Sequence, residues 1–533
     1  MLRYKFQILF FVFILICFPF SSSIAFEHEE LPVKFLNYIP ASFELAKRQK
    51  KPIFMLIAAE WCHWCKVFSE KTLADETVYS FLNEQFINIF VGAEIRRDLY
   101  VKYHADGVPY IVLMKPDGTI FYKYSGMLYA KDFLGFLKTV YKDVRNTEEE
   151  GGQIKDPLKA SELYSPPGRI QPEKIKLLRN TFIETVLENF DKEEYGIGSG
   201  SKYLMPATFL YLLEKSSLKK GVSAFSYVKG TMKKAIQNIY DSVDGGFFRY
   251  AETRHWEIPH YEKMIDVNAA ATLLLLKTNE IERSEVLQDA AFKTVSYLSS
   301  KLFDSSLNTF LSFQVANTSY YTLTRKDRSL MLEPPLVKKV FTDRLSKALI
   351  YPLESLKYLN DPSFEKKVKQ SLDFLASMVS NSKGAYHYFS FSSKKWFLTD
   401  QLPDYVYLCR LFLNASKIFG EQKYLSLFKK LSAQMISKFY DKKLKIFLEK
   451  LPQSNKDVEY LLELNSLIAL TWLSYPAHEL EGNRLDILNE IMTYFSRVDE
   501  IFEERIWEPH QWRFLEKYVP FLKASEIYFS FYD

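Results

Sequence analysis

A run of apolar residues leads almost directly into two closely spaced cysteines, and this junction constrains the fold more than any other feature of the chain. The run, Pro52–Ala59, has the length of a strand and contains no polar residue. Two residues later the chain reads Cys62-His63-Trp64-Cys65, and helix-forming sequence follows. The sequence therefore predicts a buried strand followed by a helix that carries Cys62 at its N-terminus.

This position predicts the chemistry of the pair. Unpaired N–H groups and the positive end of the helix dipole stabilise a thiolate at a helix N-terminus, so we expect Cys62 to be the nucleophile. Cys65 follows one helical turn later on the same side, where it can attack a mixed disulfide and release the partner. The two cysteines are thus candidates for a redox-active disulfide. Between them, His63 can favour the thiolate and the bulky Trp64 can narrow the range of partners.

A zinc site and a purely structural disulfide are the alternatives for this pair. His63 or His104 could add a zinc ligand, but structural zinc takes four ligands. The chain has only four cysteines in 533 residues and no second closely spaced pair. We therefore expect a redox pair with no metal and no cofactor, and we interpret Cys409 as a buried core thiol.

Strands and helices alternate after the cysteines. Predicted helices cover 78–85, 98–104 and 129–142, and predicted strands cover 86–91, Tyr110–Met114 and Thr119–Tyr124. This order, together with Trp-Cys-x-x-Cys-Lys, resembles the thioredoxin fold, and we place a thioredoxin-like domain at 32–144. Gly107-Val108-Pro109 falls where that family has its active-site cis-proline. The resemblance implies that Pro109 leaves the Val108 backbone free to pair with a bound substrate strand.

One departure from the thioredoxin pattern bears on proton transfer. Thioredoxins carry a buried aspartate six residues before the first cysteine, and this chain has Leu56 there. The proton of Cys65 must then be handled by water, Glu60 or His63. We therefore expect slow or specialised exchange rather than general reductase activity.

The first 25 residues are typical of a secretory signal peptide. Arg3 and Lys5 precede the apolar run Ile8–Phe20, and Ser23 and Ala25 occupy a small-residue cleavage pattern. The run is shorter than the ~20 residues that a bilayer span needs. We expect a periplasmic or secreted protein, with an uncleaved membrane anchor as the alternative. The net charge of only +5 gives no reason to propose binding to nucleic acid or to an anionic membrane surface.

The remainder of the chain has the apolar period of helices. Residues 145–174 are polar and contain Gly151-Gly152 and Pro166-Pro167, which is typical of a linker before a helical domain at 175–533. Low glycine (18 residues) and 16% aromatic residues suit packed helices. Twelve successive helices predict six hairpins and an (α/α)6 toroid, so the fold class is α/β followed by all-α. The predicted helices are 172–190, 205–218, 225–242, 262–278, 284–301, 341–360, 363–380, 401–419, 421–439, 457–475, 483–497 and 514–530.

Polar chemistry in the helical part concentrates in one loop region. Asp244–Tyr250 contains two glycines and several aromatics, and His255–Lys263 adds histidines, a tryptophan and an acid just before a predicted helix. Taken singly, each charged residue suits a structural role, such as helix capping by Glu262. Together, the aromatics, histidines and acid are typical of a sugar-stacking surface. The candidate pocket residues are Arg249, Tyr250, Trp256, His260, Glu262 and, farther along the chain, Asp400.

These motifs carry a specific family resemblance. Trp-Cys-His-Trp-Cys, then Gly-Gly-Phe-x-Arg-Tyr, then Trp-x-x-Pro-His-Tyr-Glu-Lys-Met is similar to the pattern of the spermatogenesis-associated protein 20 family. The resemblance covers most of the mature chain and is strong from about residue 35 to 275. It implies a thioredoxin-like domain followed by a six-hairpin, glycosidase-like toroid.

The chain also departs from this family in the toroid. Where the family pattern has an acid, this chain has Val267. An acidic stretch of the family corresponds here to Gln314–Thr318, and a Trp-Asn pair of the family corresponds to Arg344-Leu345. Glycoside hydrolysis needs two carboxylates at a fixed separation, and an epimerase would use histidines such as His260 and His387 as acid and base. The carboxylates that could still form a pair are Glu262, Asp266, Asp400 and Asp404. The missing acids favour a toroid that binds rather than cleaves.

Three functional hypotheses follow. The leading one is an exported thiol–disulfide oxidoreductase that acts on protein thiols or disulfides, with a toroid that binds a partner or a glycan. The second is a carbohydrate-active enzyme, a glycosidase or a sugar epimerase, with its active site in the toroid. The third is a non-enzymatic docking protein.

Overall fold

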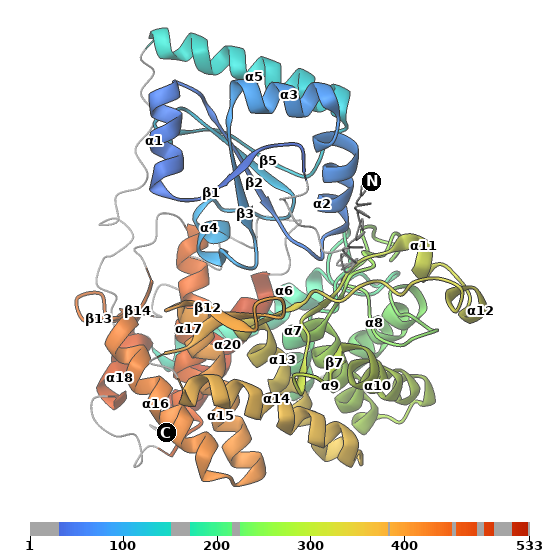
Figure 1. The fold of residues 1–533 in the computed structure, drawn as a ribbon. Coiled ribbons are helices and arrows are strands. Elements are labelled where there is room, and N and C mark those ends of the chain that lie inside the picture. Colours follow the sequence, from blue (N-terminus) through green and yellow to red (C-terminus); the bar gives the residue numbers. More distant parts are fainter. Residues whose placement is uncertain are drawn as a thin grey trace, which may run out of the picture.

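The apolar run before the cysteines forms the central strand of a five-stranded sheet (Figure 1). In the computed structural model of the protein, β2 (Ile53–Ala58) pairs in parallel with β3 (Ile87–Gly92) and antiparallel with β4 (Tyr110–Met114). At the edges, β1 (Phe35–Asn37) is parallel to β3, and β5 (Ile120–Ser125) is antiparallel to β4. All six residues of β2 are buried, which requires cover on both faces of the sheet. This is a thioredoxin-like sheet, as predicted.

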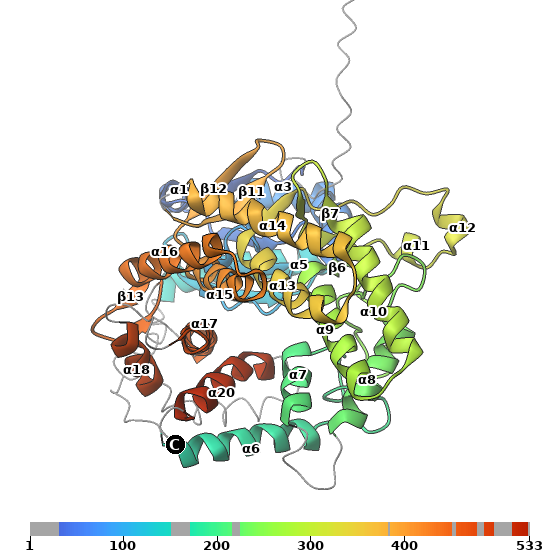
Figure 2. The same ribbon diagram turned by 90° about the horizontal axis from the view of Figure 1, so that it is seen from below.

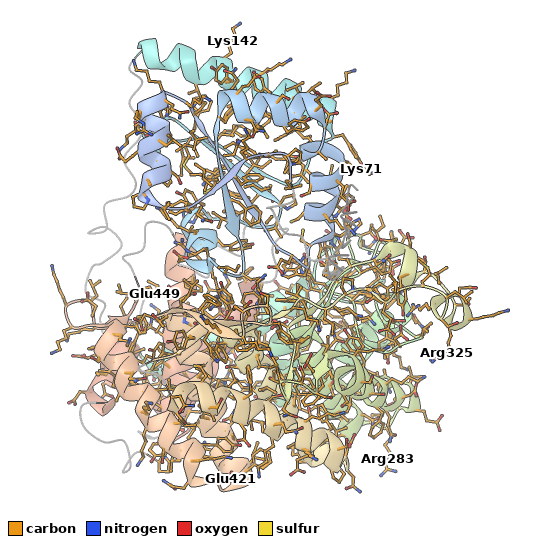
Figure 3. All side chains as sticks on the ribbon, viewed as in Figure 1. Lys71, Lys142, Arg283, Arg325, Glu421 and Glu449 are labelled. Atoms are coloured by element: carbon orange, nitrogen blue, oxygen red, sulfur yellow. The ribbon has the colours of Figure 1, made fainter. Side chains whose placement is uncertain are left out.

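The structure describes residues 31–150, 171–215, 224–381, 384–449, 455–476, 484–494 and 514–530. The predicted signal peptide therefore lies outside the described residues. Within the described part of the chain, no helix is both long enough and apolar enough to cross a membrane. Charged side chains such as Lys71, Lys142, Arg283 and Arg325 are exposed on the surface of both domains (Figure 3).

Helices surround the sheet, and those from the cysteine motif onward follow the order that the sequence predicts. They are α1 (Pro40–Gln49), α2 (His63–Phe68), α3 (Glu76–Gln85), α4 (Arg97–Lys102) and α5 (Ala130–Glu150). Helix α5 continues to Glu150 and α6 begins at Pro172, so helix occupies both ends of the segment predicted as a linker. The prediction placed the first boundary too early because the polar residues before Gly151 include good helix formers. Residues 151–170 lie outside the described part.

In the described part of the chain, twelve helices form a double ring, and each corresponds to one of the predicted helices (Figure 2). Successive members of the inner ring contact one another, and the last contacts the first, so the inner ring closes. Its helices are α7 (Pro206–Lys215), α9 (Ile265–Ile281), α13 (Thr342–Ser355), α15 (Leu402–Phe419), α17 (Asn455–Leu473) and α20 (Leu515–Phe529). The outer helices are α6 (Pro172–Glu188), α8 (Ala224–Asn238), α10 (Glu285–Tyr297), α14 (Pro362–Ser380), α16 (Gln422–Phe439) and α18 (Arg484–Tyr494). The predicted (α/α)6 architecture is confirmed.

The position of a helix in the ring follows from its sequence. Helix α9 contains Ala269–Leu276, which is buried on all sides because neighbours enclose an inner helix. Helix α14 alternates buried apolar positions with exposed or half-buried lysines, as expected for an outer helix with one solvated face. Prolines at the first turn of α14 and α15 suit the end of a helix where an N–H has no partner.

The connections between helices contain short strands and two short helices that were not predicted. They are too brief to produce a readable period in the sequence. The strands are β6 (Lys263–Met264), β7 (Phe303–Asp304), β8 (Thr309–Phe310), β9 (Phe313–Gln314), β10 (Lys339–Phe341), β11 (Tyr386–Ser390), β12 (Lys395–Thr399), β13 (Tyr440–Asp441) and β14 (Ile446–Phe447), and the helices are α11 (Thr318–Tyr321) and α12 (Arg325–Arg328).

The thioredoxin-like domain sits over the end of the ring at which α9, α13 and α15 begin (Figure 1). Apolar contact is continuous across this junction, since the core of the domain also includes Met264, Phe313, Val315, Val337 and Phe341 of the helical part. Each of the three inner helices has an acid in its first turn at this end, namely Asp266, Asp343 and Asp404. The active-site edge of the thioredoxin-like sheet and the mouth of the ring therefore face each other.

Candidate functional site

Cys62 is the N-cap residue of α2, as the sequence predicts. Its sulfur accepts a hydrogen bond from the Cys65 backbone N–H at 3.1 Å. Both cysteines are free thiols, so the predicted Cys62–Cys65 disulfide is not formed and the structure describes the dithiol form. Both are also buried, with 5% and 1% of their surface exposed. Little of either side chain is therefore accessible from the surface.

The residue before the predicted cis-proline faces this sulfur. The Val108–Pro109 peptide bond is cis. The Cys62 thiol donates to the carbonyl oxygen of Val108 at 3.4 Å. The structure thus brings Pro109 and the backbone of Val108 beside Cys62, where the thioredoxin resemblance places them.

Cys65 is held as a thiol. Burial raises its pKa well above the ordinary value, and the hydrogen bond with Cys62 acts in the same direction. The Glu262 carboxylate of the helical domain raises this pKa further. A thiol is a poorer nucleophile than a thiolate, so these surroundings disfavour the reactive form of Cys65.

The residues proposed to modulate the pair lie in different surroundings. Burial lowers the pKa of His63, so the imidazole is neutral at pH 7, and the Glu262 carboxylate acts in the opposite direction. Trp64 is 38% exposed, and the centre of its ring lies 5.2 Å from that of His63. Glu60 forms an ion pair with Lys339 from the helical domain. Glu60 therefore helps to join the domains.

Four of the six candidate pocket residues meet at the cysteine motif. The Arg249 guanidinium lies 4.7 Å from the centre of the Trp61 ring, and its Nη1 donates to Glu262 Oε1 at 3.0 Å. The ring of Tyr250 stacks on His260, with 4.0 Å between the ring centres. It also stacks on Tyr203, with 4.6 Å between the ring centres. The pocket predicted for the toroid and the predicted redox pair therefore form one region.

Glu262 is the most deeply buried member of this group. Only 2% of its side chain is exposed, and its Oε2 has no hydrogen-bond partner. His260 Nδ1 lies 3.8 Å from Glu262 Oε1, and burial lowers the pKa of His260, which keeps its imidazole neutral. The carboxylate is thus paired with one cation and leaves one oxygen available.

Two predicted pocket residues are not part of this group. Trp256 is fully buried, and its Nε1 donates to the carbonyl oxygen of Glu194 at 2.9 Å, so it is a core residue. Asp400 lies in the turn between β12 and α15, where it pairs with Lys438 and accepts from Tyr405 at 3.4 Å. Their assignment to the pocket was wrong because composition and spacing cannot distinguish a buried tryptophan or a turn acid from a ligand contact.

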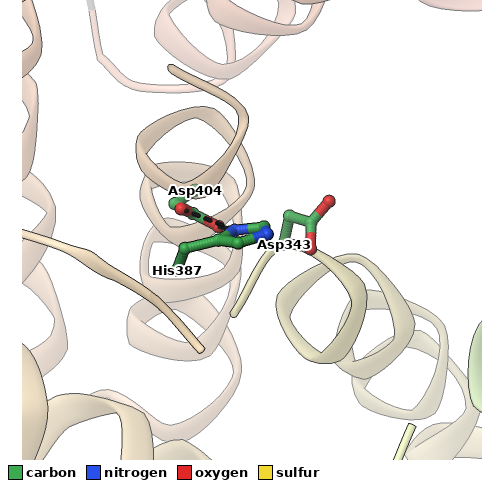
Figure 4. A group of neighbouring side chains, drawn as sticks. All are labelled: Asp343, His387 and Asp404. Carbon is green, nitrogen blue, oxygen red and sulfur yellow. Dashed lines mark hydrogen bonds and ion pairs between the residues drawn. The ribbon is translucent and has the colours of Figure 1, made fainter. Parts of the chain in front are cut away.

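A second cluster lies at the mouth of the ring and contains Asp343, His387 and Asp404 (Figure 4). His387 Nδ1 lies 3.1 Å from Asp404 Oδ2, and its Nε2 lies 2.7 Å from the backbone oxygen of Glu94 in the thioredoxin-like domain. Asp343 pairs with Arg97. These partners occupy the atoms that a metal ion would need, so the cluster is a charge network between the domains.

The charge of His387 follows from these contacts. Burial alone would lower its pKa, but the carboxylates of Asp404 and Asp343 outweigh burial and raise it to about 10. Burial raises the pKa of Asp404 to about 6, so this carboxyl is ionised at pH 7. A histidine that stays protonated and hydrogen-bonded at both nitrogens is a poor acid–base catalyst.

The four carboxylates considered for glycoside chemistry all hold cations. Glu262 pairs with Arg249, Asp266 with Arg344, Asp400 with Lys438 and Asp404 with His387. Arg344 also binds both carboxylate oxygens of Glu94 at 3.2 Å. It thereby links Asp266 to the thioredoxin-like domain, and sequence analysis could not find this contact because the partners are 250 positions apart.

The N-terminal part of the chain matches the model of a known family. Residues 19–156 match the family Thioredox_DsbH, described as a protein of unknown function, DUF255. Spermatogenesis-associated protein 20 of Rattus norvegicus is 27% identical over 298 residues, and that of Mus musculus is 27% identical over 344 residues. The chain is similar to spermatogenesis-associated protein 20, at distant identity.

The matches to these spermatogenesis-associated protein 20 relatives are partial. They cover 52% and 58% of this chain but only 38% and 43% of the rat and mouse proteins. Among solved structures, cellobiose 2-epimerase from Spirochaeta thermophila aligns with 68% of this chain and 99% of its own at 11% identity and a TM-score of 0.49. A structure named DsbH oxidoreductase aligns with 21% of this chain and 85% of its own at 17% identity and a TM-score of 0.20.

Proposed function

We propose that the protein is a thiol–disulfide oxidoreductase that uses Cys62 and Cys65. The observation that carries this proposal is the position of the Cys62 sulfur. It lies at the start of a helix, 3.1 Å from the Cys65 N–H and 3.4 Å from the Val108 oxygen. The first contact and the helix dipole stabilise a thiolate, and the second places backbone polar groups where a partner strand would bind.

The exchange balances with the two cysteines alone. In the reducing direction, the Cys62 thiolate attacks a partner disulfide, and one partner sulfur leaves as a thiolate that is protonated by solvent. Cys65 then loses its proton and attacks the Cys62 sulfur. The Cys62–Cys65 disulfide forms, the bond from Cys62 to the partner breaks, and the partner has gained two electrons and two protons. The reverse sequence oxidises a dithiol, and the difference in reduction potential sets the direction.

The burial of the site supports selective exchange. Cys62 is 5% exposed, and helical-domain residues contact Trp61 directly before it. Only a partner segment that fits beside Trp64 and the Val108 backbone would reach the sulfur. We propose that the partner is a protein thiol or disulfide in an exported compartment, as the predicted signal peptide suggests, and that the toroid helps to select it.

Two single variants test this function with a matched control. Cys62→Ser should abolish exchange with glutathione disulfide, because the nucleophile is lost. Cys65→Ser should accumulate mixed disulfides with particular proteins of the native compartment, because resolution is lost. Cys409→Ser, which changes a cysteine buried in α15, should exchange as wild type does. Normal exchange by Cys62→Ser would rule the proposal out.

A carbohydrate ligand is the second candidate, and the stack of Tyr203, Tyr250 and His260 favours it. Ionic pairing of the four carboxylates supports binding rather than hydrolysis. The carbohydrate hypothesis is tested by measuring turnover or binding of an oligosaccharide. This activity should disappear in the Glu262→Gln variant but persist in a variant that lacks both thiols. Equal protein-partner binding by wild type and a Cys62/Cys65 double variant would instead favour the docking hypothesis.

A further inference from the structure

The residue directly before Cys62 is held by contacts with the helical domain. Trp61 is buried, and its ring centre lies 4.7 Å from the Arg249 guanidinium and 5.9 Å from the ring centre of Phe313. Both of these partners belong to the helical domain. The indole N–H of Trp61 donates to Glu94 Oε1 at 3.3 Å, so the polar atom of this buried ring is satisfied.

Glu94, which accepts that N–H, is in turn held by the helical domain. It follows β3 and Trp61 follows β2, so the two residues lie at the same edge of adjacent parallel strands. Arg344 donates Nε to Glu94 Oε2 and Nη2 to Glu94 Oε1, each at 3.2 Å. His387 Nε2 lies 2.7 Å from the backbone oxygen of Glu94. A planar guanidinium that binds both oxygens fixes the orientation of a carboxylate as well as its distance.

The other end of this connection is anchored in the ring. Arg344 lies in the first turn of α13, and its Nη1 donates to Asp266 Oδ2, in the first turn of α9, at 3.2 Å. Helices α9 and α13 are packed against each other as neighbours in the inner ring. The side chain of Trp61 is therefore positioned relative to two inner helices of the ring, by way of Glu94 and Arg344.

The position of Trp61 bears on the reaction because Cys62 is the next residue. The Cys62 sulfur accepts the Cys65 N–H at 3.1 Å and lies 3.4 Å from the Val108 oxygen. These contacts place it where the N-terminus of α2 stabilises a thiolate. A reacting group that is misplaced by about 1 Å can lose about 100-fold in rate. A change in the position of Trp61 should therefore alter the rate at which Cys62 attacks.

We propose that Arg344 positions Cys62 for attack on a disulfide, acting through Glu94 and Trp61. This proposal rests on the proposed oxidoreductase function. In the step concerned, the Cys62 thiolate forms a bond to one sulfur of the disulfide, the S–S bond breaks, and the other sulfur leaves as a thiolate. Arg344 acts through two other side chains, so it is a positioning residue. The thioredoxin-like domain thus reaches its full rate of attack only when it is docked on the helical domain.

The test measures the attack step in the full-length protein, with Cys65→Ser as the background and glutathione disulfide as the probe. The rate of mixed-disulfide formation is followed by quenched mass spectrometry. Arg344→Gln should slow attack about 10-fold, the effect of a displacement smaller than 1 Å. Trp61→Phe, which removes the indole N–H and keeps an aromatic ring, should slow it similarly. The two changes together should be no slower than the slower single variant, because both break the same connection.

Variants of Glu94 separate positioning from a general loss of structure. Glu94→Gln keeps an oxygen that can accept the indole N–H of Trp61, whereas Glu94→Ala does not. Glu94→Gln should therefore retain more of the attack rate than Glu94→Ala. Equal rates in the two variants would contradict a connection that runs through this hydrogen bond.

The matched control is Arg97→Gln, because Arg97 pairs with Asp343 across the same junction. It should attack at the wild-type rate, and thermal unfolding shows how far each variant is destabilised. Equal slowing by Arg97→Gln and Arg344→Gln would overturn the proposal, because it would indicate weakened docking in general. An unchanged rate in Arg344→Gln, or additive effects of Arg344→Gln and Trp61→Phe, would also overturn it. Absence of mixed-disulfide formation in the Cys65→Ser background itself would instead overturn the oxidoreductase function.

Discussion

The Arg249 guanidinium lies 4.7 Å from the centre of the Trp61 ring and holds Glu262 at 3.0 Å, so one side chain of the helical domain connects the cysteine motif to a buried carboxylate. Arg249 and Trp61 are far apart in the sequence. The contact makes the junction between the domains part of the candidate site. Its energetic importance can be measured directly.

Arg249→Ala should lower the free energy of unfolding by about 3 kcal/mol, because Glu262 would remain buried without its cation. Arg283→Ala is the control, since Arg283 is exposed on the helical domain far from the junction (Figure 3). The control should change stability by less than about 0.5 kcal/mol. Denaturant unfolding measures both, and an Arg249 variant as stable as the control would show that the contact contributes nothing.

The Asp343–His387–Asp404 network predicts a pH dependence of stability. The pKa of His387 is raised from 6.5 to about 10 in the folded protein, so the folded state retains a proton that the unfolded state loses. The stabilisation of the folded state by protonated His387 is complete below about pH 6.5 and is lost as the pH rises toward 10. His387→Gln should therefore show a flatter decline in unfolding free energy between pH 7 and 9. Parallel curves for wild type and variant would contradict the charge assignment.

Asp241 neutralises two buried cations, and its loss should be severe. Lys263 Nζ donates to it at 2.7 Å and Arg328 Nη1 at 2.9 Å, and both cations are buried. Asp241→Asn should cost about 4 kcal/mol of stability, because it leaves buried charges without compensation. Asp244→Asn, which removes a more exposed partner of Arg328, should cost clearly less. Similar melting temperatures for the two variants would refute this ranking.

The two adjacent glycines of the pocket motif should be required by the backbone. Gly245 has φ +82°, and an added Cβ would lie 2.5 Å from the backbone oxygen of Lys293. Gly245→Ala should therefore destabilise the protein by about 2 kcal/mol or more. Gly135→Ala in α5, where a Cβ meets nothing within 4 Å, should be neutral or stabilising by up to about 1 kcal/mol. Thermal unfolding of the Gly245→Ala and Gly135→Ala variants shows whether the glycines of this motif are needed for stability or for ligand binding.

Local sequence patterns predicted the secondary structure of the two domains well, because helices and strands depend largely on residues that are neighbours in the sequence. The strand before Cys62 is apolar at every position, and the ring helices keep a helical period, four of them with a proline in the first turn. The contact between Arg249 and Trp61 has no such signal, since it depends on how two separately folded units dock. Trp256 was misassigned for a related reason, because burial depends on packing from distant elements. Tertiary contacts were therefore the part that the sequence could not reveal.

The most direct test of the account is the mass of the cysteine peptides after equilibration of the full-length protein in glutathione buffers of increasing oxidation. The account predicts a reversible loss of two hydrogen atoms confined to the peptide that contains Cys62 and Cys65, with Cys409 unchanged. If that peptide kept both thiols across the whole series, or if the change mapped to another cysteine, the redox assignment would be contradicted.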